Sequence, residues 1–223
     1  MLFRSPWIPI LPAPDDAPVP PVAHYVRGRP DKVYTYRDEN GQVNGYVYLF
    51  TTSDGGKETY PVTFCRHRNT GKKEWRWMAF SDHARPLYNL DLLHENPDLP
   101  VLLVEGEKCA DIGIEKLLVL LKKFIVITWQ GGSKAPHKSD WRPLIGRKIF
   151  AWADCDSKRR KLTADEKKSG VDPESVPLMP EADQPGMRAM RQIHNILMEL
   201  DQDIDFHFVD IPNPGDKRDG WDI

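Results

Sequence analysis

The stretch PVLLVEGEKCADIGIEKLLVLLKK, residues 100–123, decides the fold class of this chain. Four consecutive apolar residues precede Glu105 and Gly106, which is typical of a strand that is buried on both faces. After Gly106 the apolar residues return at helical spacing, at Ala110, Ile114, Leu117, Leu118 and Leu121. The stretch therefore predicts a buried strand that leads directly into an amphipathic helix.

The same alternation continues downstream. Apolar strands are expected at FIVITW (124–129), RKIFAWADCD (147–156) and IDFHFVDI (204–211), and a second amphipathic helix at 186–200. Continuously apolar strands that alternate with helices are typical of parallel sheets covered by helices. We therefore expect an α/β domain with a mainly parallel sheet flanked by helices.

The chain upstream of this domain has a different texture. Residues 33–80 contain four short runs rich in Val, Tyr, Thr, Phe and Trp, separated by Asn, Asp and Gly, which predicts a small antiparallel β-rich module. Eight of the twenty prolines precede it, which indicates an extended arm that Trp7 and Ile8 could pin. The expected organisation is a proline-rich arm (1–30), a β-rich basic module (31–98) and the α/β domain (99–223) with a charged insert (157–184).

Composition excludes several classes of protein. Hydrophobic residues make up 40% and charged residues 29% of the chain, as in ordinary soluble proteins. No apolar run is long enough to cross a membrane, and prolines break the N-terminus before a signal peptide could form. The three cysteines are far apart, which argues against a disulfide framework or a four-cysteine zinc site. We expect a cytoplasmic protein with no membrane partner.

The net charge of −2 argues against a protein that coats nucleic acid by charge alone. The charge is segregated, however, because residues 57–88 hold seven Lys or Arg residues against three acids. A template track and a solvated sheet face are equally good interpretations of this segment. Its candidate nucleic-acid contacts are Arg66, Arg68, Lys72, Lys73, Arg76 and Arg85.

Carboxylates follow two of the expected strands. Glu105 ends the first strand of the α/β domain, and Asp154 and Asp156 end the third. Ligands in open α/β sheets bind beyond the carboxyl ends of the strands, where these acids would converge. Their repulsion would be relieved by a divalent cation, and oxygen ligands suit Mg²⁺ or Mn²⁺. An isolated Asp-x-Asp pattern is more often a helix cap or a solvated charge, so the combination carries the prediction.

Two lysines are further candidates for phosphate contacts. Lys108 would lie in the first turn of a helix, where a cation opposes the helix dipole and a nearby anion would compensate. Lys134 ends the sequence Gly131–Gly132–Ser133–Lys134, which either approaches a nucleotide phosphate or forms an ordinary loop. Trp75 and Trp77 could stack on bases, although their alternation with polar residues favours a core role.

The stretches VLLVEGEKCAD and FAWADCD resemble the TOPRIM domain of bacterial-type primases, topoisomerases and some nucleases. ARPLYNLDLL, TWQGGSKA, PGMRAM and GWDI resemble, in order, further blocks of primase-like TOPRIM proteins of phages, plasmids and integrated elements. This resemblance implies acid/base or metal chemistry for Glu105 and metal binding by Asp154 and Asp156. It also implies nucleoside triphosphates as substrates, a single-stranded DNA template, primer synthesis for mobile-element replication, and a helicase or ATPase domain in the same chain or in trans. Because the chain stops at GWDI, we expect it to be a piece of a longer protein.

Two positions depart from the family pattern. Bacterial-type primases usually have an Asp four residues after the TOPRIM glutamate, and this chain has Cys109 there, with Glu107 or Asp111 as possible substitutes. The Pro-Gly pair that soon follows the Asp-x-Asp pattern in relatives comes here only after the insert 157–184. Two alternatives stay open: a TOPRIM nuclease that uses the same acids to activate water, and a catalytically degenerate module that binds nucleic acid or a helicase.

Overall fold

The computed structural model describes residues 5–120 and 123–221 of the chain. The chain divides into two compact units. The N-terminal unit runs to Pro97 and includes the short segment Lys138–Asp140, and the α/β unit contains Asp98–His137 and the residues from Trp141 onward.

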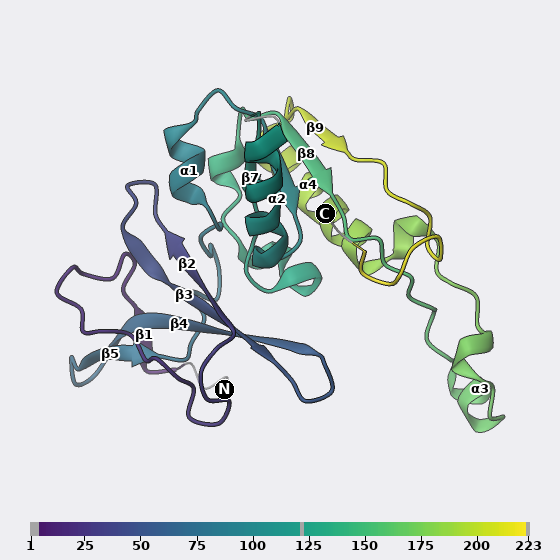
Figure 1. The fold of residues 1–223 in the computed structure, drawn as a ribbon, viewed down its shortest axis with the longest axis horizontal. Coiled ribbons are helices and arrows are strands. Elements are labelled where there is room, and N and C mark those ends of the chain that lie inside the picture. Colours follow the sequence, from purple (N-terminus) through teal and green to yellow (C-terminus); the bar gives the residue numbers. More distant parts are fainter. Residues whose placement is uncertain (1–4, 121–122, 222–223) are drawn as a thin grey trace. The chain divides into compact units, whose positions relative to one another are not determined.

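The N-terminal unit is an antiparallel sheet of five strands, as expected in kind. Four strands have the order β1-β4-β3-β2, and β5 also pairs with β4. A single short helix, α1, follows the sheet in this unit as described (Figure 1). The bounds are β1 Trp7–Pro9, β2 Lys32–Arg37, β3 Val43–Thr51, β4 Lys57–His67, β5 Lys73–Arg76 and α1 Leu90–Glu95.

The proline-rich arm is part of this sheet unit. It contributes β1, which pairs with the end of β4, and Trp7 packs edge-on against His67 with ring centroids 4.9 Å apart. Farther along, the Trp75 indole N–H donates to the carbonyl of Pro18 at 2.5 Å, and the Tyr48 hydroxyl donates to that of Pro21 at 2.8 Å. These contacts fix the arm against the sheet.

The core of the N-terminal sheet is aromatic. Its centre is Tyr48, Phe50 and Val62, and Trp75 and Trp77 pack against this centre. The last strand, β5, ends at Arg76, four residues before the end of the segment 33–80 that is expected to be rich in strands. Trp75 and Trp77 are partly buried and pack against the core, which agrees with the favoured interpretation.

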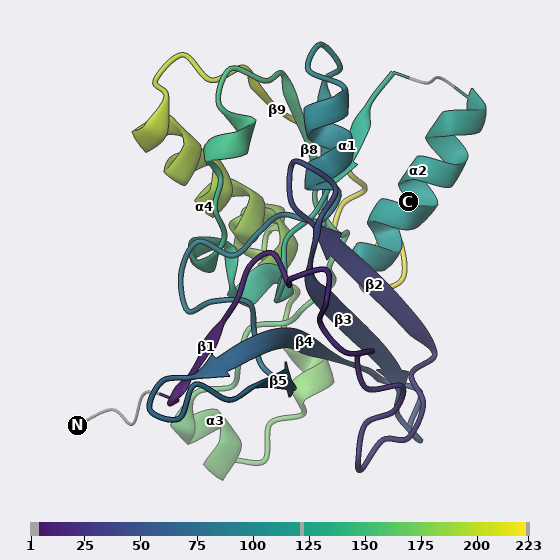
Figure 2. The same cartoon turned by 90° about the vertical axis from the view of Figure 1, so that its left-hand side faces the viewer.

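The α/β unit contains the expected parallel sheet. Its four strands have the order β7-β6-β8-β9, and every neighbouring pair is parallel. Figure 2 shows α2 and α4 on opposite sides of this sheet. The bounds are β6 Val101–Val104, α2 Glu107–Leu120, β7 Ile125–Ile127, β8 Ile149–Trp152, α3 Ala164–Lys168, α4 Pro185–Leu200 and β9 Phe206–Phe208.

The helices fit their predicted ranges with two qualifications. The buried face of α4 contains Met190, Ile193 and Leu197 as expected, whereas Leu200 in its last turn is 45% exposed. In α2, Ala110 is buried, and the side chains of Leu117 and Leu118, with all of Leu121, lie outside the described residues.

The order of the strands creates a topological switch point. From β6 the chain passes through α2 to the outer strand β7, and from β8 it passes through α4 to the opposite outer strand β9. The connections leave the two central strands in opposite directions, which opens a crevice beyond their carboxyl ends. Residues that directly follow β6 and β8 therefore lie at the natural ligand position of this sheet. None of the helices in the described ranges is long and apolar enough to span a bilayer.

Candidate active site

The two central strands bring the three candidate acids to one edge of the sheet. β6 and β8 are parallel neighbours, with Val104 opposite Trp152 at their last paired positions. Glu105 follows β6 directly, and Asp154 and Asp156 follow β8. All three acids therefore leave the sheet at the switch point between its two halves.

Glu105 has one oxygen held and one left over. Its Oε1 accepts the backbone N–H of Ser133 at 2.9 Å. Its Oε2 is buried and has no hydrogen-bond partner among the described residues. Burial raises the pKa of Glu105, and the negative charge of Asp156 raises it further. The side chain therefore meets the loop after β7 at one oxygen and carries an uncompensated buried oxygen at the other.

The segment Asp154–Asp156 forms a tight turn at the end of β8. The N–H of Asp156 donates to the carbonyl of Asp154 at 2.9 Å, which closes a three-residue turn. Cys155 is buried between the two partly exposed acids. The two acids are therefore partly exposed on a turn that closely follows β8, while the thiol between them is buried.

Asp156 also acts on the helix that follows the insert. Its Oδ2 accepts the N–H of Gly186, in the first turn of α4, at 2.8 Å. Burial raises the pKa of Asp156, and the nearby charge of Asp219 raises it as well. The capping role that an Asp-x-Asp pattern commonly has is thus present at one oxygen of Asp156.

The end of the chain returns to this turn. The N–H of Cys155 donates to the carbonyl of Trp221 at 2.8 Å, and the N–H of Gly220 donates to the carbonyl of Cys155 at 3.0 Å. Asp219 accepts the N–H of Ser157 at 2.8 Å and pairs with the Lys158 ammonium. Asp219 is therefore a fourth acid near the site, which the sequence analysis missed, although it directly precedes the block GWDI.

The loop after β7 approaches Glu105 closely. A Cβ added to Gly132, which has a φ of +57°, would lie 3.5 Å from Oε1 of Glu105. The hydroxyl of Thr128 accepts the N–H of Gly106 at 2.9 Å, which ties this loop to the turn after β6. Gln130 is buried, and neither its amide nitrogen nor its amide oxygen has a partner in the described ranges. The sequence analysis missed Gln130 because glutamine at a strand end has no distinctive pattern.

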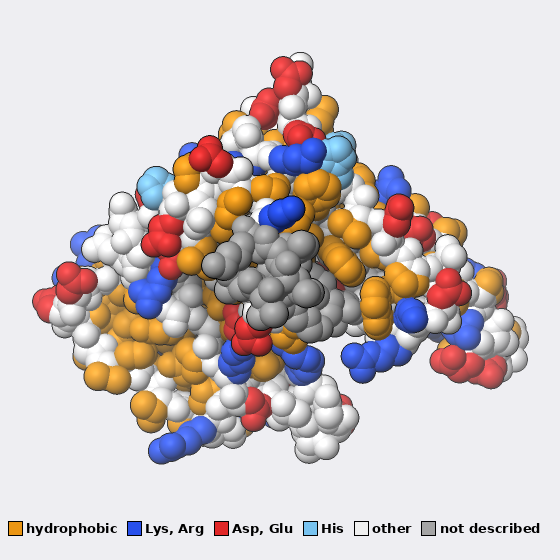
Figure 3. Space-filling view, turned by 45° about the horizontal axis from the view of Figure 1, so that its top comes forward, with side chains coloured by type: hydrophobic (Ala, Val, Ile, Leu, Met, Phe, Trp, Pro, Cys, Tyr) orange, Lys and Arg blue, Asp and Glu red, His pale blue; other side chains and the backbone are white. Residues whose placement is uncertain are grey.

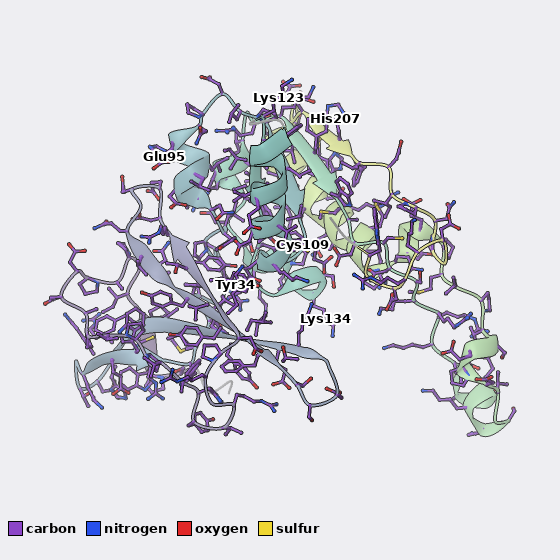
Figure 4. All side chains as sticks on the ribbon, in the orientation of Figure 1. Tyr34, Glu95, Cys109, Lys123, Lys134 and His207 are labelled. Atoms are coloured by element: carbon purple, nitrogen blue, oxygen red, sulfur yellow. The ribbon has the colours of Figure 1, made fainter. Side chains whose placement is uncertain are left out.

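The two candidate lysines lie on elements that adjoin this edge. Lys108 is exposed in the first turn of α2, and Lys134 is exposed at the end of a 3-10 turn, Gly132–Lys134. Figure 4 labels Lys134 and Cys109. Cys109 is buried within α2, as is Glu107, while Asp111 is partly exposed. Phosphate contacts by Lys108 and Lys134 stay a prediction, as does the substitution of Glu107 or Asp111 for the family's Asp.

The donor set fits a divalent cation, although no site is assembled in advance. Within the described ranges, no three His, Cys, Asp or Glu side chains are grouped as a ready-made metal site. Glu105 nevertheless has a buried oxygen with no partner in the described part of the chain, and burial raises the pKa of both Glu105 and Asp156. Carboxylate oxygens are ligands that Mg²⁺ and Mn²⁺ prefer, and a bound cation would compensate their buried charge.

The insert 157–184 is a folded excursion that leaves and returns at one point. Gln184 is buried; its Oε1 accepts the N–H of Lys158 at 2.9 Å, and its Nε2 donates to the carbonyls of Lys158 at 3.1 Å and Met179 at 2.8 Å. The excursion carries α3 at its outer end (Figure 1). A single side chain thus closes the base of the insert next to Asp156.

The basic residues of the N-terminal unit are distributed over both faces of the β4–β5 hairpin. Arg66 and Lys73 are directly opposite and share one face. Lys72 and Arg76 pair with Glu74 at 2.5 and 2.7 Å, and Glu74 alternates with Lys73 and so lies on the other face. A contact of these residues with a template stays a prediction.

The two remaining basic candidates also lie in this unit. Arg68 is exposed, just after β4. Arg85 donates to the carbonyl of Ser81 at 2.8 Å, and burial lowers its pKa.

Comparisons with known proteins complete the description. No protein-family model and no curated protein sequence matches the chain. The chain is similar to one from a bacteriophage T7 assembly, described as the lagging-strand DNA polymerase interacting with primase domains of two gp4 subunits bound to an RNA/DNA hybrid and dTTP. The TM-score is 0.46 with 14% identity, and the match covers 82% of this chain and 66% of the other.

Proposed function

We propose that this chain is the catalytic core of a DNA primase, which joins nucleotides into short primers on single-stranded DNA. The observation that carries the proposal is Glu105 at the switch point: one of its oxygens is buried and has no partner among the described residues, and burial, with the charge of Asp156, raises its pKa. The sequence resemblance to primase-like TOPRIM proteins supplies the reaction class.

The reaction transfers a nucleotidyl group from a nucleoside triphosphate. The 3′-hydroxyl of the growing primer attacks the α-phosphorus, a new P–O bond forms, and pyrophosphate leaves with the electrons of the broken bond. Glu105 would accept the hydroxyl proton or hold the metal, and its raised pKa favours a role as base. When bound, Mg²⁺ or Mn²⁺ held by Glu105, Asp154 and Asp156 would neutralise charge on the reacting phosphate.

The loop after β7 would position the triphosphate. Gly131 and Gly132 both have positive φ, so the backbone can approach a ligand where a side chain would interfere. Lys134 and Lys108 are the candidates for phosphate contacts, and Gln130 offers a buried amide with both polar atoms unpartnered in the described ranges. A helicase or ATPase partner would supply single-stranded template.

A primer-synthesis assay tests the proposal. The protein is incubated with single-stranded DNA, labelled nucleoside triphosphates and Mg²⁺ or Mn²⁺, and the products are separated by size. Wild-type protein should make short labelled products, and Glu105→Gln and Asp156→Asn should lose them. Asp203→Asn, an exposed acid beyond α4, is the matched control and should retain synthesis.

The same assay discriminates between the rival functions. A nuclease would shorten the added DNA in a metal-dependent way and make no primers, and the same two variants would lose cleavage. A degenerate binding module would show neither activity. Either result would refute the primase proposal.

A further inference from the structure

Three aromatic rings form a continuous stack on the N-terminal unit. The ring of His24 stacks on Tyr60, with centroids 4.8 Å apart and an interplanar angle of 30°. Tyr25 also lies against His24, with centroids 4.3 Å apart and the rings tilted by 33°. Trp77 meets His24 edge-on at 4.6 Å and so supports the stack from the side. The stack starts on the sheet at Tyr60 and ends at Tyr25.

The inner ring of the stack is fixed and its outer ring is open. His24 is buried, and its Nδ1 accepts the N–H groups of Val26 and Arg27, both at 3.2 Å. Two backbone hydrogen bonds between His24 and Gly28, of 2.7 and 2.9 Å, close the loop around it. Tyr25, by contrast, is 85% exposed. A rigid loop therefore presents an aromatic ring to solvent, which keeps the entropy cost of binding to that ring low.

The charges around Tyr25 are complementary to a phosphate backbone. Arg27 and Arg29 lie on the same loop and are exposed. Arg27 pairs with Glu58 at 2.6 Å, whereas Arg29 makes no ion pair within the described ranges. Val22 and Val26 are also exposed, at 69% and 70%. Figure 3 shows hydrophobic side chains gathered over the N-terminal unit, with Lys and Arg side chains at their margin.

We propose that Tyr25 is a stacking platform for an unpaired base of single-stranded nucleic acid, with Arg29 next to the adjoining phosphate. A base on Tyr25 would extend the stack by one ring, and its sugar-phosphate would lie near the free guanidinium. Base–aromatic stacking tolerates any sequence, because every base has a π-face. The proposal takes its ligand class from the proposed function, but the contact is made without metal or nucleotides and in the N-terminal unit.

Equilibrium binding of a labelled oligothymidylate to the full chain, without metal or nucleotides, tests this platform. Tyr25→Ala should weaken binding by about 5- to 150-fold, the usual range for loss of one stacking ring. Tyr25→Phe should bind like wild type, and Tyr25→Leu, which keeps an apolar side chain without a ring, should bind like Tyr25→Ala. Val22→Ala, an exposed apolar residue of the same segment, is the matched control and should leave the affinity unchanged.

Two further measurements define the ligand. Arg29→Gln should reduce the slope of log affinity against log salt by about 0.7, the value for one phosphate contact on a single strand. A blunt duplex of the same length should not respond to Tyr25→Ala, because its bases are paired and stacked. Thermal melting of each variant checks the fold, which substitution of so exposed a ring should not change.

The inference is overturned if Tyr25→Ala binds single strands as wild type does, or if wild-type protein does not bind them at all. Equal loss in Tyr25→Ala and Val22→Ala would also overturn it, since an apolar docking surface for a protein would explain that result. Primer synthesis is measured separately with metal and nucleotides. Failure of the platform is therefore distinguishable from failure of the proposed function.

Discussion

The backbone N–H of Gly186 in α4 donates a hydrogen bond of 2.8 Å to Oδ2 of Asp156, which lies before the insert in sequence. A Cβ built on Gly186 would lie 3.0 Å from the carbonyl oxygen and 3.1 Å from the nitrogen of Asp154. The start of α4 thus packs directly on the backbone of the acidic turn. Glycine is needed here for close approach, since its backbone is helical.

This packing predicts that Gly186→Ala reduces catalysis more than stability. The new methyl group would displace the turn Asp154–Asp156 by a few tenths of an ångström, and misplacement of reacting groups is costly. We expect primer synthesis to fall about tenfold or more, while the free energy of unfolding changes by about 1 kcal/mol or less. Arg188→Ala, exposed on the same helix, should leave both unchanged. Normal synthesis in Gly186→Ala would contradict the proposal that these acids lie at the reacting centre.

The ion pair between Arg160 and Glu166 in the insert should break only at low pH. The Arg160 guanidinium pairs with Glu166 at 2.7 Å and, with the backbone N–H of Thr163, lowers the pKa of Glu166 to about 2 from 4.5. Because the pKa of Glu166 is lowered in the folded chain, its ionised carboxylate stabilises α3 fully above about pH 4.5. This contribution is lost as the pH falls toward 2. Amide chemical shifts of residues 164–169 should therefore change with a midpoint near 2. Glu166→Gln should abolish that transition, and a midpoint near 4.5 in wild-type protein would show that the pair does not form.

The parallel sheet could be predicted because its strands are uniformly apolar, as VLLV at 101–104 illustrates. Buried parallel strands need apolar residues on both faces, so sequence and structure carry the same signal. The switch point between β6 and β8 follows from the strand order. The bonds from Glu105 to Ser133 and from Asp156 to Gly186 do not, because the residues that meet are far apart in sequence.

The residues that sequence reasoning missed have their roles only in three dimensions. Gln130 is unusual because it is buried and both of its side-chain polar atoms lack a partner in the described ranges. Asp219 lies near the site because the last part of the chain returns to Ser157, whose N–H it accepts. Sequence reasoning favoured a core role for Trp75 and Trp77 over stacking on bases, and both pack against the sheet core. Tyr25, in the proline-rich arm, has an exposed ring. Its contact with the buried ring of His24 is visible only in the structure, so sequence reasoning did not single it out.

We expect Gln184, at the base of the insert, to contribute to the stability of the fold. Gln184 is 2% exposed and makes three hydrogen bonds to the backbones of Lys158 and Met179. Gln184→Ala would remove the side-chain partner of the Lys158 N–H and of the Met179 carbonyl, whereas the Lys158 carbonyl would keep the N–H of Met179 at 2.9 Å. Each lost bond costs about 1–3 kcal/mol when water does not replace it. We expect a loss of about 3 kcal/mol in the free energy of unfolding, measured by urea denaturation. Gln202→Ala, at an exposed position, should change it by less than about 0.5 kcal/mol.

The last prediction concerns Mg²⁺ and the acids at the switch point. A ligand that binds only the folded state stabilises it by about 2.7 kcal/mol at 100 times its Kd, which is roughly 5–10 °C for a chain of this size. The melting temperature of wild-type protein should therefore rise with Mg²⁺ or Mn²⁺, since a bound cation would compensate the buried negative charge of Glu105 and its repulsion by Asp156. Glu105→Gln and Asp156→Asn should lose this rise, while Asp203→Asn keeps it.

Asp156→Asn is the sharper of these two variants, because an amide oxygen can still accept the N–H of Gly186 and so preserves the start of α4. Asp156→Ala would remove that hydrogen bond together with the charge, so its metal response and its stability could not be separated. A wild-type melting temperature that ignores millimolar Mg²⁺ and Mn²⁺ would contradict a metal site at Glu105 and Asp156. Retention of the full rise in Asp156→Asn would instead place the cation on other ligands.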